Sequence, residues 1–73
     1  MIEILEQKFE EDDLVEIEHK KGFKVVGYIH NKDWLDKIFK LISISCRNKS
    51  KLGLISYRNI NILKIKKLEV KNG

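Results

Sequence analysis

The chain has 73 residues, a formal net charge of +4, no proline and a single cysteine. This length predicts one domain, residues 1–73, and a domain so small buries only about 60% of its unfolded surface, so it usually needs disulfides, a metal ion or oligomerisation. A lone cysteine excludes an intramolecular disulfide, and the cysteine and two histidines lack the spacing of metal ligands. We therefore expect a cytoplasmic, self-associating domain with no cofactor, no metal and no membrane contact.

The first predicted element is a short helix over residues 2–10. Ile2, Leu5 and Phe9 recur at helical spacing, and the glutamates between them would occupy the opposite face. Glutamates in the first turn also suit the helix dipole. Because so short a helix is unstable by itself, we expect it to dock on the rest of the domain.

Five short strands are predicted after this helix, over residues 14–18, 23–30, 38–46, 52–57 and 60–65. Gly22 ends the first turn, where glycine can take a positive φ. Gly27 stands inside the second strand, where a glycine indicates a bend or a close approach of another backbone. So few residues predict a mostly β fold: a short N-terminal helix, a small, strongly bent, five-stranded antiparallel barrel over residues 14–68, and a frayed tail at 69–73.

The charges are distributed unevenly along the chain. Residues 1–18 contain eight carboxylates and one lysine, a net charge of −7, so the other 55 residues carry +11. Either a basic surface meets nucleic acid, or acidic and basic surfaces meet each other within the protein or between subunits. Among single side chains, His19 and His30 are expected on the surface of strands, and Cys46 is expected in the core.

Two groups of residues carry a family resemblance: Val15, Ile17, Gly22, Gly27, Ile29 and Asp33 in the first group, and Tyr57, Arg58 and Ile62 in the second. With this spacing, residues 2–65 resemble the Sm-like family, which includes archaeal and eukaryotic Sm proteins and bacterial Hfq. The resemblance implies a ring of six or seven identical copies, joined edge to edge through the fourth and fifth strands, that binds single-stranded RNA at its inner rim. Unpaired strand edges independently favour such self-association.

The resemblance also implies an RNA-binding site made of Asp33, Trp34, Lys37, Arg58 and Asn59. Arg58 would contact a base edge or a phosphate, and Asp33 would orient the pocket. Trp34 lies next to the family's stacking position, and Lys37 replaces its base-reading asparagine with a charge. Asn59 replaces a glycine and would keep the tight turn, because asparagine tolerates the left-handed region.

A second class of function stays open, because each of these residues also has an ordinary structural role. Leu35 and Lys37 occupy the positions where the family places its stacking and base-reading residues. The barrel would then be a protein-binding module, such as a phage or plasmid accessory protein that docks on a host protein, with Trp34, Tyr28 and Tyr57 as anchors. No catalysis is expected, because no nucleophile–base set, phosphate-binding loop or paired carboxylates can be identified.

Overall fold

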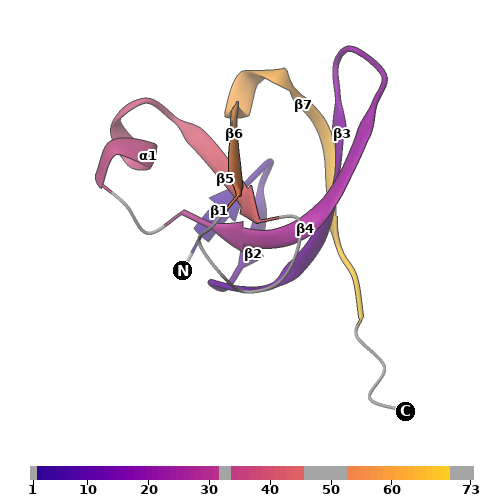
Figure 1. Cartoon of the computed structure of the whole chain (residues 1–73), viewed down its shortest axis with the longest axis horizontal. Helices are drawn as coiled ribbons and strands as arrows, with labels where there is room; N and C mark the ends of the chain where they lie inside the picture. Colours follow the sequence, from indigo (N-terminus) through magenta and orange to yellow (C-terminus); the bar gives the residue numbers. More distant parts are fainter. Residues whose placement is uncertain (1, 32–33, 46–52, 70–73) are drawn as a thin grey trace.

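The computed structural model describes residues 2–31, 34–45 and 53–69. Its seven strands form two antiparallel sheets (Figure 1). The two-stranded sheet pairs β1 (Ile2–Ile4) with β2 (Gln7–Phe9), and the five-stranded sheet has the order β6-β5-β4-β3-β7. The strands of the larger sheet are β3 (Leu14–His19), β4 (Lys24–His30), β5 (Leu41–Ser45), β6 (Leu54–Arg58) and β7 (Ile62–Lys67). The mostly β fold predicted from the sequence is confirmed.

Two short helical segments connect the strands. Helix α1 (Trp34–Ile38) links β4 to β5, and a 3-10 turn (Asn59–Asn61) links β6 to β7. The strand predicted to start at residue 38 therefore starts at Leu41, because α1 takes the residues before it. In the described part of the chain, no helix has the length and apolar character needed to cross a membrane.

The helix predicted over residues 2–10 is wrong, because this segment is the β1–β2 hairpin. Leu5 and Glu6 form its two-residue turn with φ values of 49° and 66°, which is the left-handed geometry of a type I′ turn. Ile2 and Ile4 alternate in period 2 and are buried, whereas Leu5 is 41% exposed. Burial of β-branched side chains at strand spacing outweighs the helix propensity of the glutamates.

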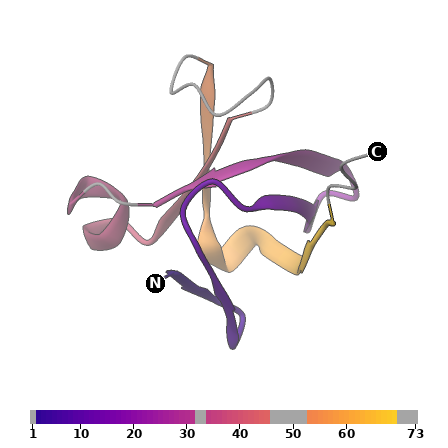
Figure 2. The same ribbon diagram turned by 90° about the horizontal axis from the view of Figure 1, so that it is seen from below.

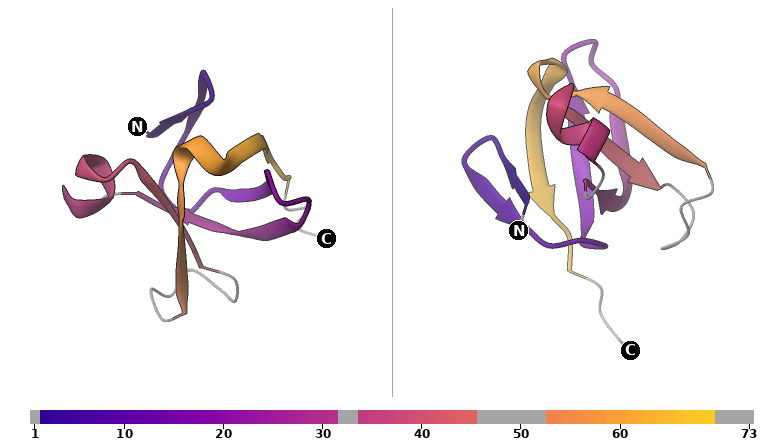
Figure 3. Two further views of the ribbon diagram at one scale, coloured as in Figure 1. Left: turned by 90° about the horizontal axis from the view of Figure 1, so that it is seen from above. Right: turned by 90° about the vertical axis from the view of Figure 1, so that its left-hand side faces the viewer.

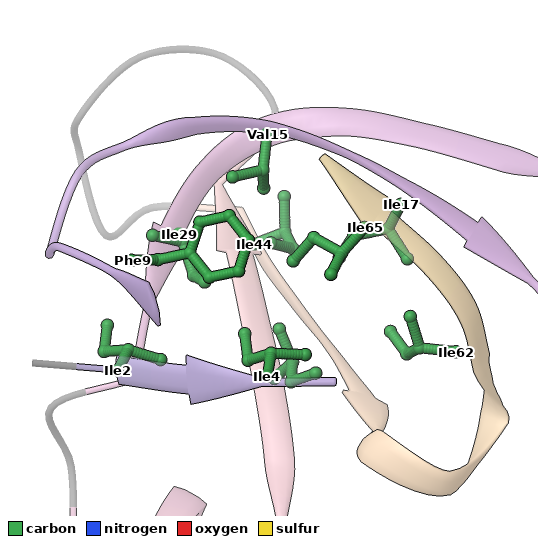
Figure 4. Packing of buried hydrophobic residues seen from close by; sticks show 10 residues of the cluster. Ile2, Ile4, Phe9, Val15, Ile17, Ile29, Ile44, Ile62 and Ile65 are labelled. Carbon is green, nitrogen blue, oxygen red and sulfur yellow. The ribbon is translucent and has the colours of Figure 1, made fainter. Parts of the chain in front are cut away.

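The sheet is strongly curved but does not close into a barrel, because β6 and β7 are its two edges and do not pair with each other. The N-terminal hairpin lies outside this sheet as a separate two-stranded layer (Figure 2). The hairpin completes the core in place of a further strand. Its side chains point toward those of the five-stranded sheet (Figure 4), and the buried apolar cluster comprises Ile2, Ile4, Phe9, Val15, Ile17, Ile29, Ile42, Ile44, Ile62 and Ile65.

The two glycines of the β3–β4 hairpin have the roles predicted for them. Gly22 has a φ of 97° and its N–H donates to the carbonyl of His19 at 2.9 Å, which closes the turn. Gly27 lies opposite Val15 inside β4 and packs against β5. A Cβ on Gly27 would come within 2.5 Å of the carbonyl oxygen of Ser45, so this position requires glycine for close backbone approach.

Candidate nucleic-acid interface

Helix α1 turns its polar side toward the sheet and its apolar side toward solvent. The hydroxyl of Ser43 on β5 donates to Oδ2 of Asp36 at 3.0 Å. A hydroxyl has one proton, so in the 2.8 Å contact between the two serine hydroxyls Ser56 is the donor to Ser43. The apolar residues of this segment are exposed: Trp34 by 70%, Leu35 by 53%, Ile38 by 51% and Phe39 by 62%. This orientation is the reverse of an ordinary amphipathic surface helix.

The end of α1 is joined to the 3-10 turn that follows β6. The N–H of Asn59 donates to the carbonyl of Lys40 at 2.8 Å, and Lys40 itself has a φ of 52°. A pocket of about 250 Å³ lies at this junction. Its lining is Ile2, Glu3, Asn31, Asp36, Lys37, Lys40, Leu41, Ile42 and Asn59. The pocket therefore brings together Lys37 and Asn59, two residues of the predicted site that are far apart in sequence.

Of the other predicted site residues, Trp34 and Arg58 lie near this junction, and Asp33 is not among the residues that the structure describes. Arg58 is exposed at the end of β6, where it lies opposite Leu41 of β5. Trp34 stands on the outward side of α1 and does not line the pocket. Sequence reasoning missed Phe39 and Lys40, although the spacing of Leu35 and Phe39 is helical and signals one shared face.

The conformation expected for Asn59 is wrong. Asn59 starts a 3-10 turn and is not among the described residues with positive φ, which are Leu5, Glu6, Asp12 and Lys40 apart from glycines. The left-handed conformation at this junction belongs to Lys40, on the other side of the hydrogen bond. The replacement of glycine by asparagine is therefore accommodated by an ordinary helical turn, and no backbone strain arises at Asn59.

The pocket carries charges of both signs. Lys37 and Lys40 are exposed cations on its rim, and Glu3 and Asp36 contribute carboxylates. Asp36 already accepts a hydrogen bond from Ser43. A phosphate placed at the rim would meet the two lysines, whose flexible ammonium groups supply charge without planar recognition of a base.

Most of the basic C-terminal strand faces acidic residues of β3, or of the turn just before it, within the same chain. Nζ of Lys66 lies 3.3 Å from a carboxylate oxygen of Glu16, and Nζ of Lys67 lies 3.6 Å from one of Asp13. Lys24 of β4 reaches Glu16 from the other side at 3.9 Å. These lysines are mostly exposed, so each pair contributes little stability. Of the two explanations for the uneven charge, contact between acidic and basic segments inside the protein accounts for these strands.

Both histidines are buried, so their predicted surface positions are wrong. His19 stacks on Phe23 with ring centroids 4.4 Å apart, and its Nδ1 accepts from the N–H of Lys21 at 3.1 Å. Nδ1 of His30 lies 3.0 Å from Oε1 of Glu11 and 3.7 Å from Oδ1 of Asp12. Aromatic packing and a carboxylate partner explain why both rings tolerate burial.

The cluster of Glu11, Asp12 and His30 was not predicted, because Glu11 and Asp12 lie in the turn between β2 and β3, whereas His30 lies at the end of β4. One potential ligand atom from each lies within 4.8 Å of the others. The Glu11 carboxylate is hydrogen-bonded inside this group and also lies 3.4 Å from the N–H of Asn31, which donates to it. The cluster therefore ties the end of β4 to the start of β3, just before the connection that leads to α1.

Comparison of the chain with protein-family models, with curated proteins and with solved structures finds no match in any of the three. The features that point to a function are accordingly the junction between α1 and the 3-10 turn and the two edge strands, β6 and β7, of the five-stranded sheet.

Proposed function

We propose that this protein is a cytoplasmic, homo-oligomeric, Sm-like protein that binds single-stranded RNA at the junction of α1 and the 3-10 turn. The main support is that Lys37 and Asn59, two residues of the site inferred from the resemblance, line one pocket. Trp34 on the same helix and Arg58 next to Asn59 extend the surface. Asp33, which precedes Trp34 in the sequence, belongs to the proposed site on the resemblance alone.

The chemistry of this surface suits a single strand better than a duplex. Proteins hold unpaired bases by stacking them on aromatic rings and hold the backbone with lysine and arginine. Trp34 is exposed enough to stack on a base, and Lys37, Lys40 and Arg58 are exposed cations. A stacked base contributes about 1–3 kcal/mol of binding free energy. Because lysine does not read base edges, we expect weak preference between uridine and adenine.

The proposed oligomer joins β6 of one copy to β7 of the next. These two strands are the edges of the five-stranded sheet. Free edges present unpaired peptide groups and favour pairing with another chain, and a repeated head-to-tail contact closes into a ring when the rotation between copies permits. The resemblance suggests six or seven copies.

The test uses the fluorescence of Trp34, because it is the only tryptophan in the chain. Titration with oligouridine and with oligoadenine should quench this fluorescence, and the affinity should fall as salt increases. Lys37→Ala should weaken binding, whereas the control Lys24→Ala, which removes an exposed lysine of β4, should not. Native mass spectrometry of the same samples gives the number of copies. Absence of quenching together with absence of binding by fluorescence anisotropy of labelled RNA would reject the proposal.

The exposed apolar side of α1 supports a second candidate, a protein-binding module. Leu35, Ile38 and Phe39 add an aliphatic and aromatic surface that RNA does not require. Of the anchors inferred from the sequence, Trp34 is exposed, whereas Tyr28 and Tyr57 are partly buried and Tyr57 packs on Phe23. A partner would therefore be held mainly by α1. Ile38→Ser distinguishes the candidates, because it should leave RNA affinity unchanged and abolish docking of a protein.

A further inference from the structure

The outer edge of β7 exposes alternate peptide groups. The N–H of Leu68 donates to the carbonyl of Leu14 at 2.8 Å, so the backbone N–H and carbonyl of Leu68 point toward β3. Peptide groups alternate in direction along an antiparallel strand, and Ile65 is three residues away in a regular register. The N–H and carbonyl of Ile65 therefore point away from β3. The carbonyl oxygen of Ile65 is therefore an acceptor that this edge could offer to an incoming strand.

That acceptor is already occupied by the N-terminal hairpin. Nε2 of Gln7 donates to the carbonyl oxygen of Ile65 at 3.0 Å, a partly buried contact between residues 58 apart in sequence. The hairpin lies beside β7 in the right-hand view of Figure 3. A groove of about 600 Å³ remains next to the contact, with Leu5 and Leu63 in its lining. The hairpin thus reaches the edge through one side-chain amide and leaves the space around it open.

We propose that Gln7 takes the place of a backbone N–H from an incoming strand, so that the hairpin covers the β7 edge and opposes assembly. This inference rests on the proposed function, in which β7 pairs with β6 of a second copy. The N–H of Asn59 donates to the carbonyl of Lys40, which directly precedes β5, so the peptide groups of Asn59 point toward β5. Because the direction alternates along the strand, the peptide groups of Leu54, Ser56 and Arg58 point away from β5, outward from the sheet. Ser56 is the central one, and its N–H competes with the Gln7 amide for the carbonyl of Ile65.

Assembly must first break the hydrogen bond between Gln7 and Ile65 at each interface. The association constant of the chain is therefore lower than that of a chain whose β7 edge is uncovered. Removing the amide should raise the constant roughly 2- to 10-fold, which corresponds to the net contribution of one hydrogen bond. Only Gln7 needs to move, because the hairpin is held to the core independently by Ile2, Ile4 and Phe9.

The experiment measures self-association of the full chain by sedimentation velocity over a concentration series that includes tens of micromolar. Gln7→Ala removes the donor, and Gln7→Glu replaces it with a carboxylate that the carbonyl repels; both should strengthen association. Lys8→Ala is the control, because it truncates the next, exposed residue of β2. Ser56→Pro removes the outward N–H of β6 and should weaken association. Slow exchange of the Gln7 side-chain amide protons by NMR, at a concentration where the chain is monomeric, tests the contact by itself.

The outcomes separate the two proposals. Stronger association of both Gln7 variants, with slow amide exchange in the wild type, supports the proposal that Gln7 blocks the β7 edge. Unchanged or weaker association of the Gln7 variants, while Ser56→Pro dissociates the oligomer, overturns the blocking role of Gln7 and leaves the pairing of β6 with β7 intact. If the wild-type chain and the Gln7 variants stay monomeric at every concentration, both the pairing of the edges and the blocking role of Gln7 are overturned. If Ser56→Pro fails to fold, the Gln7 variants and the amide exchange decide the question.

Discussion

Gly27 of β4 lies directly against Ile44 of β5, so that a Cβ on Gly27 would collide with Cγ2 of Ile44. The carbonyl oxygen of Ser45 closes the same space from the backbone side. Ile44 and Ser45 are both fully buried, so neither side chain can move into solvent. The close contact between β4 and β5 therefore depends on the missing side chain.

We expect Gly27→Ala to lower the free energy of unfolding by about 1–3 kcal/mol, because overpacking forces the neighbouring strand to shift. Urea denaturation monitored by circular dichroism measures this change. Val26→Ala is the control, since Val26 is the preceding residue of β4 and is half exposed, and it should change stability by less than about 1 kcal/mol. Equal effects of the two substitutions would contradict the steric explanation.

The N-terminal hairpin offers a stabilising substitution. Glu6 has a φ of 66° in the two-residue turn between β1 and β2, where glycine is strongly preferred. Glu6→Gly should raise the free energy of unfolding by about 0.5–1 kcal/mol, as relief of left-handed strain exceeds the added entropy of the unfolded chain. The urea midpoint should increase. Glu3→Gly, placed inside β1, should lower it, and a decrease for Glu6→Gly as well would show that its side chain has a stabilising contact.

The buried ring of His30 depends on Glu11. Loss of this carboxylate in Glu11→Ala leaves Nδ1 of His30 without its 3.0 Å partner. We expect a loss of about 1–3 kcal/mol in the free energy of unfolding, the usual effect of a stranded buried polar group. Thermal unfolding measures it. Glu10→Ala is the matched control, because Glu10 is exposed and the hydrogen bonds that it makes with Asp13 use its backbone N–H and carbonyl, which alanine keeps; a similar loss in both variants would refute a specific role for Glu11.

The RNA proposal makes a prediction about Arg58. Arg58→Ala should weaken binding of single-stranded RNA by about 1–3 kcal/mol for each engaged contact and leave fold and copy number unchanged. Arg58→Lys should restore part of the affinity, because lysine keeps the charge and loses the planar fork. Fluorescence titration at several salt concentrations distinguishes these effects. Full restoration by lysine would mean that Arg58 contributes charge alone, and no change with alanine would remove it from the site.

The sequence by itself determined the features that depend on local period and on glycine. Val15 and Ile17 alternate with glutamates and form a half-buried strand, as predicted. Gly22 takes positive φ because the turn needs it, and Gly27 marks a close approach because no side chain fits there. Each of these outcomes follows from chemistry within a few residues, where steric limits on the backbone act directly.

Only the tertiary structure decided the features that depend on distant partners. Ile2 and Phe9 have helical spacing, Ile2 and Ile4 have the spacing of a strand, and packing of all three in the core selected the hairpin. The contact between Gln7 and Ile65 spans 58 residues, and that between Glu11 and His30 spans 19, so no local sequence pattern predicts either contact. Helix α1 was not predicted, and only Ile38, its last residue, was assigned to a strand, because the apolar residues of α1 point outward, against the rule that burial drives element formation. Long-range packing and hydrogen bonding, which a short segment cannot encode, made these choices.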